Sequence, residues 1–75
     1  MRRSGSKYQV GDRFIMRQST EFFSRGETVE ITDVLGKNRH NRTQVRIISV
    51  NPYVDVEDNP SEVVSVIVFG RRVKH

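Results

Sequence analysis

The stretch ETVEITDVL, residues 27–35, decides the fold class that the sequence predicts. Its side chains alternate: Val29 and Ile31 face one way, and the threonines and glutamate beside them face the other. A period of two residues belongs to a β-strand, because successive side chains point to opposite faces of a sheet. A strand with one apolar face packs that face on a core and leaves the other in water. The stretch therefore predicts a strand over an all-β core.

Three more runs with strand character lie on either side of it, at residues 13–17, 43–50 and 62–69. The first two also alternate, whereas the run at 62–69, EVVSVIVF, is apolar on both faces. Its second face needs a cover, which comes from another part of the chain or from a second copy. Turn signals separate the runs, and Gly70 is expected to end the last one. The predicted core consists of Phe14, Val29, Ile31, Val45, Ile47 and Val66.

Four or five short strands with turns between them predict a small five-stranded β-barrel of the SH3-like or OB-like kind. Only residues 18–26, QSTEFFSRG, could hold a helical turn, capped by its serine and threonine, with Phe22 and Phe23 plugging one end of the barrel. We expect a flexible basic tail at residues 1–7 and a single barrel domain over residues 8–75. The chain has no cysteine, so neither disulfides nor thiolate zinc sites reinforce it.

The segment VGDRFIM, residues 10–16, matches the hydrophobic-x-Gly-Asp opening of small barrels, in which the glycine permits a tight turn and the aspartate accepts backbone N–H bonds. Together with GE at 26–27, VEITDV at 29–34 and VRIISV at 45–50, it resembles the small SH3-like orphan proteins that bacteriophage genomes encode. The resemblance spans most of the chain. It implies a barrel fold, and a phage-type protein of this kind would bind and modulate a host protein.

The chain carries 13 Lys and Arg residues against 9 Asp and Glu residues, and the two signs are segregated along it. Basic residues gather in the N-terminal third, in the loop after residue 35 and in the C-terminal tail, whereas acids gather at 27–33 and 55–62. The basic loop is long for a hairpin, whose tight form needs only two residues. Its length and charge are not needed to reverse the chain, so a contact role is reasonable.

The basic clusters predict binding to nucleic acid, because Lys and Arg neutralise phosphates and small barrels bind nucleic acid between protruding loops. Tyr8 and Tyr53 are the aromatic residues expected at the surface, where bases could stack on them. The alternative is a protein-interaction module that docks an acidic protein surface, as a monomer or a homodimer. The candidate contact residues for either partner are Lys37, Arg39, His40, Arg42, Arg46, Arg71, Arg72, Tyr8 and Tyr53.

Other classes of function are disfavoured. The longest apolar run is too short to cross a bilayer, and the start MRRSGSKYQVGD lacks the apolar stretch of a signal peptide, so we expect a cytoplasmic protein without a membrane partner. His40 lies among cations that repel a metal, and the acids at 55–62 lack the glycine of a calcium loop. We therefore expect no enzyme activity, no cofactor and no metal.

Overall fold

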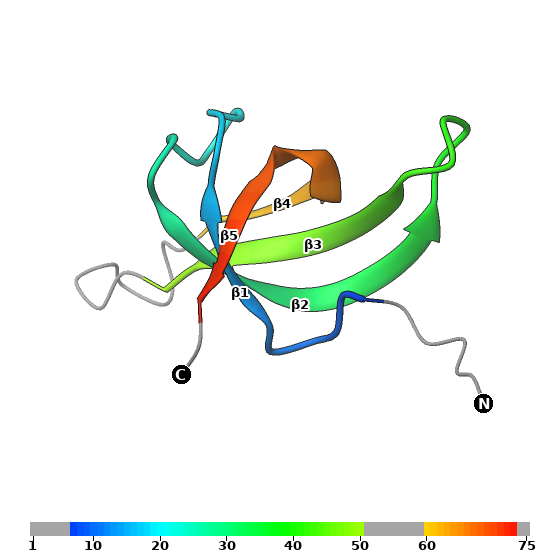
Figure 1. Ribbon diagram of the computed structural model, residues 1–75, viewed down its shortest axis with the longest axis horizontal. Coiled ribbons are helices and arrows are strands. Elements are labelled where there is room, and N and C mark those ends of the chain that lie inside the picture. The colour runs from blue at the N-terminus through cyan, green and yellow to red at the C-terminus, as the bar shows by residue number, and fades with distance from the viewer. Residues whose placement is uncertain (1–6, 51–59, 74–75) are drawn as a thin grey trace.

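The computed structural model describes residues 7–50 and 60–73, which form one five-stranded antiparallel sheet (Figure 1). The strand order is β4-β3-β2-β1-β5, and each neighbouring pair runs antiparallel. The described residues contain no α-helix, so the predicted all-β class is confirmed. The elements are β1 (Arg13–Met16), β2 (Thr28–Lys37), β3 (Thr43–Ser49), β4 (Ser61–Ser65), the short 3-10 helix η2 (Val66–Val68) and β5 (Phe69–Val73).

A single apolar core lies inside the bend of this sheet. Val29 and Ile31 on β2 have no exposed surface, as their alternation predicts, and Val45 and Ile47 on β3 are equally buried. Of the six predicted core residues only Val66 is misplaced, because it is half-buried at the margin of the core. The buried apolar side chains are Phe14, Met16, Phe23, Val29, Ile31, Val45, Ile47, Val64, Val68 and Phe69.

The prediction of one strand over residues 62–69 is wrong. The Ser65 side chain accepts a hydrogen bond from the Ile67 backbone N–H and caps η2, which turns the chain from β4 into β5. Val63 and Ile67 are 45% and 39% exposed, while Val64, Val68 and Phe69 are buried. The second apolar face of the run is therefore partly uncovered in the described chain, and the turn brings Phe69 into the core directly after Val68. Gly70, expected to end the run, lies inside β5 instead.

Residues 18–26 form a turn without a helix, so the predicted helical turn is also wrong. The Thr20 hydroxyl accepts from the Phe23 backbone N–H at 3.3 Å, which is the expected capping role. A contact from outside the segment shapes the rest: Glu62 Oε1 accepts from the Thr20 hydroxyl at 2.8 Å and from the Phe22 N–H at 3.1 Å. Phe23 is buried as expected, but Phe22 remains 51% exposed.

The sheet order leaves β4 and β5 as the two edge strands. Within the described residues no ladder of hydrogen bonds joins these two strands, so the sheet is open at this seam. At one end of the seam, Arg17 reaches η2: its backbone N–H donates to the Val68 carbonyl at 2.9 Å and its Nε to the Ile67 carbonyl at 2.6 Å. In the described part of the chain, no helix is long and apolar enough to cross a membrane.

Candidate functional site

The β2–β3 hairpin extends beyond the rest of the sheet (Figure 1). On one side, β1 pairs with β2 only as far as Glu30, and on the other side β4 ends its pairing at Gln44. The last two rungs of the hairpin are Gly36 with Gln44 and Lys37 with Thr43, and only the second forms a two-stranded ribbon beyond both neighbouring strands, because Gln44 still pairs with Ser65 of β4. We call residues 36–43, which form the end of this ribbon, the basic tip.

Asn38 shapes the loop of the basic tip. Its side-chain Oδ1 accepts hydrogen bonds from the backbone N–H groups of His40 at 2.9 Å and Arg42 at 3.2 Å. Its backbone N–H donates to the Arg42 carbonyl, and its carbonyl accepts from Asn41, both at 2.9 Å. Asn41 has a φ of 63°, a left-handed conformation that asparagine tolerates better than most residues. The loop is therefore held by its own polar groups.

The basic side chains of the tip point into solvent. Lys37, Arg39, His40 and Arg42 are all exposed, and none of them forms an ion pair with another described residue. The backbone of the loop is satisfied by Asn38, so these side chains are not needed to hold it. They are available to a ligand. The sequence reasoning missed Asn38, although an asparagine that opens a loop is a known signal for this kind of turn.

Arg46 lies on the same ribbon, nearer to the body of the sheet. It is exposed on β3, directly opposite Asp33 on β2 and Val63 on β4. Arg46 extends the basic surface of the tip without belonging to its loop.

Arg71 and Arg72 are not brought to the basic tip. Arg72 pairs with Phe14 on β1, and Phe14 pairs with Val29 near the start of β2. From Val29, β2 continues to Lys37, and the usual rise of about 3.3 Å per residue makes this part of the strand roughly 25 Å long. Figure 1 shows the C-terminal end of β5 at the lower left and the β2–β3 loop at the upper right. The two basic groups belong to different regions of the surface.

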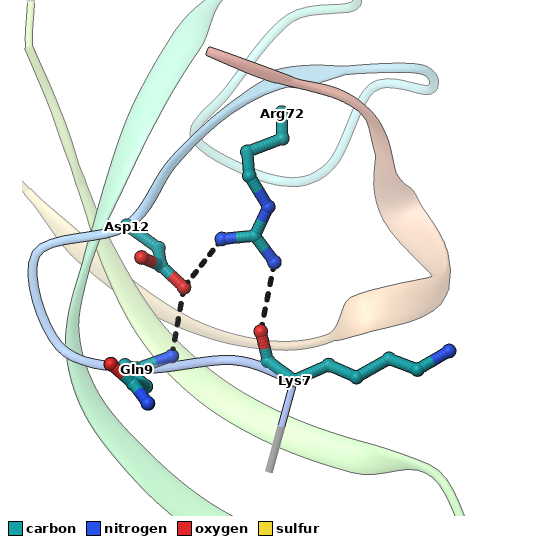
Figure 2. A network of polar contacts seen from close by, with 4 residues as sticks. All are labelled: Lys7, Gln9, Asp12 and Arg72. Atoms are coloured by element: carbon teal, nitrogen blue, oxygen red, sulfur yellow. Dashed lines mark hydrogen bonds and ion pairs between the residues drawn. The ribbon is translucent and has the colours of Figure 1, made fainter. Parts of the chain in front are cut away.

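Arg72 is already engaged in contacts within the chain (Figure 2). Its guanidinium forms an ion pair with Asp12 at 2.7 Å, donates to the Lys7 carbonyl at 2.8 Å and lies 4.7 Å from the centre of the Phe14 ring. Asp12 Oδ2 also accepts from the Gln9 backbone N–H at 3.0 Å, as the Gly-Asp opening predicts. Arg72 therefore ties the segment before β1 to the last strand.

The remaining candidates are aromatic. Tyr8 was expected at the surface, but it is half-buried, with its ring 5.5 Å from that of Phe14 and 6.3 Å from that of Phe69. The two phenylalanine rings stack at 4.6 Å, so Tyr8 completes an aromatic cluster and its ring is not free for stacking on a base. Tyr53, most of the acidic stretch 55–62 and residues 1–6 of the expected tail lie outside the described residues.

The structure thus gathers Lys37, Arg39, His40 and Arg42 at one projecting tip, with Arg46 beside them on the ribbon. It separates these residues from Arg71, Arg72 and Tyr8. The candidate site is accordingly the basic tip. No protein-family model, curated protein or solved structure matches the chain.

Proposed function

We propose that the chain is a non-enzymatic SH3-like barrel that binds nucleic acid through the basic tip. Support for the barrel comes from the bent β2 and β3, from bulges in β2 that increase such bending, and from β5 returning to pair with β1. The core inside the bend has the arrangement that a small barrel needs. The resemblance to the small SH3-like proteins of bacteriophages belongs to the same proposal.

The observation that carries the proposed function is the state of the tip cations. Lys37, Arg39 and Arg42 project from the end of a ribbon, are exposed, and form no ion pair among the described residues. Each can neutralise a phosphate and release its counterions, and the arginine fork can grip two oxygens at once. The pairing of β1 ends at Glu30 and that of β4 at Gln44, so the Lys37–Thr43 rung and the loop that it closes project past both strands and can be approached by a nucleic acid.

A protein partner is the second candidate, and the open edge of β4 favours it. An edge strand offers unpaired backbone groups to which an extended segment of another chain can add. Val63 on β4 and Ile67 on η2 add exposed apolar surface near that edge. A modulator of a host protein would use this edge, with the basic tip setting the orientation against an acidic surface.

The test compares two triple variants that lose the same charge. Replacing Lys37, Arg39 and Arg42 with glutamine should reduce the slope of log affinity against log salt by about 2–3 units, because each phosphate contact contributes about 0.7–0.9. The matched control replaces Lys7, Arg25 and Arg71, which are exposed and form no ion pair among the described residues. The control variant should keep most of the slope of log affinity against log salt. Both variants should unfold at nearly the wild-type temperature, because exposed charges contribute little to folding.

Two results would contradict the proposal. Equal losses in the two variants would show that general positive charge, and not the tip, binds the nucleic acid. An absence of binding to DNA and RNA at low salt would remove nucleic acid as the ligand. A protein partner whose association slows in the tip variant would then become the preferred function.

A further inference from the structure

We infer that the ligand of the basic tip is double-stranded DNA of B form, and that the tip enters its major groove. This inference rests on the proposed function and adds the class of nucleic acid. Beyond Gln44 on β3 and Glu30 on β2, no third described strand flanks the hairpin, so the ribbon that is free on both sides consists of the Lys37–Thr43 rung and the loop it closes. Two strands lie about 4.8 Å apart, and the major groove of B-form DNA, about 12 Å wide, admits such a ribbon.

The side chains at the end of the ribbon suit the edges of base pairs. Arg39 and Arg42 are exposed, and a guanidinium can donate two hydrogen bonds to guanine in the major groove. Asn41 is exposed too, and its side-chain amide makes no hydrogen bond to another described residue; an amide of this kind pairs with adenine. Lys37, at the base of the loop, is placed for a phosphate at the rim of the groove.

The aromatic residues argue against a single-stranded ligand. Binding of single strands relies on a row of rings on which successive bases stack, and the loop from Asn38 to Arg42 offers only one ring, the imidazole of His40. Tyr8, Phe14 and Phe69 pack on one another. Phe22 is exposed, but its backbone is bound to Glu62 at the start of β4, on the body of the sheet.

Duplex RNA is also a poor fit to the tip. The major groove of an A-form helix is deep and narrow, and side chains cannot read it. Its minor groove is wide and shallow, so a projecting two-stranded ribbon would gain little from insertion there. Among the three forms of nucleic acid, the B-form duplex is the one whose groove matches the shape of the tip.

The first experiment measures the affinity of the wild-type chain by fluorescence anisotropy at one low salt concentration. The probes are a DNA duplex of about two helical turns, one of its strands alone, and an RNA duplex of the same sequence. We expect the DNA duplex to bind about tenfold more tightly than either alternative, since one good pair of base contacts is worth that much. Tighter binding to the single strand or to the RNA duplex would overturn the inference and leave the proposed function intact.

The second experiment locates the groove. Bulky glucosyl groups on the cytosines of the duplex fill the major groove and should weaken binding about tenfold, whereas a small ligand that fills the minor groove should leave it unchanged. The opposite pattern, or equal binding to blocked and unblocked duplexes, would overturn the inference alone.

Changing Arg39 and Arg42 to lysine keeps the positive charge but removes the guanidinium fork. The salt dependence of the affinity should therefore persist, while the differences in affinity between duplex sequences diminish. No binding to any probe would overturn the proposed function as well.

Discussion

Two neighbouring arginines on β5 carry the same charge and differ in what they contact. Arg72, whose side chain is 45% exposed, lies over the Phe14 ring and pairs with Asp12, whereas the exposed Arg71 forms no ion pair within the described part of the chain. The sequence placed both among the candidate contacts, because nothing in the letters RRVKH separates them. The pairing of Arg72 with Phe14 across the β1–β5 ladder decides the difference.

Replacing Arg72 with glutamine should therefore destabilise the fold by about 1–2 kcal/mol, since it removes a partly exposed ion pair and a contact with an aromatic face. The same change at Arg71 removes an equal charge and should stay within about 0.5 kcal/mol of wild type. Urea unfolding followed by circular dichroism measures both. If the two variants unfold at the same urea concentration, the contacts of Arg72 contribute nothing to stability.

The elements of the sheet differ in how well the sequence predicts them. The strands at 28–37 and 43–49 are predicted by their alternation, and the loop between them by Gly36 at its start. The turn at η2 is not predicted by the sequence, because Val66–Val68 are apolar like their neighbours and none of these three residues is a glycine or a proline. Ser65 is the only local signal, and a serine inside an apolar run is also compatible with a continuous strand.

The basic tip should depend on the side chain of Asn38. Asn38→Ala removes two hydrogen bonds to the backbone, so we expect a loss of about 1–2 kcal/mol, which is a fall of about 4–15 °C in the thermal midpoint of a domain of this size. Asn38→Asp keeps the accepting oxygen and should keep most of the stability. Calorimetry of the two variants tests this. Similar midpoints for Asn38→Ala and wild type would mean that the strands alone hold the loop.

At the scale of the whole molecule, the buried side chains form one cluster that draws on every strand. A single cluster predicts cooperative unfolding, so circular dichroism and tyrosine fluorescence should report the same transition. Ile47→Ala should cost about 2–5 kcal/mol, because Ile47 is fully buried. Ile67→Ala, a matched change at a residue that is 39% exposed, should cost much less. Equal effects, or transitions that differ between the probes, would contradict a single cooperative core.

The overall arrangement could be predicted from the sequence only in part. Periodicity identified the all-β class and the core positions on β1, β2 and β3, because each depends on neighbours within one strand. The distance between the basic tip and β5 depends on the register of strands far apart in the chain, and so does the packing of Tyr8 on Phe69. The basic residues that form one set of candidate contacts in the sequence therefore lie in two regions of the structure.

The hydrogen bonds that shape the loop at 38–42 begin and end inside that loop, as far as the described residues show. The fold and the proposed binding surface are thus encoded by different residues. Replacing the side chain of Arg39 or Arg42 removes none of the hydrogen bonds that hold the loop. If the basic tip binds as proposed, its ligand preference can therefore change at these two positions while the fold stays as it is.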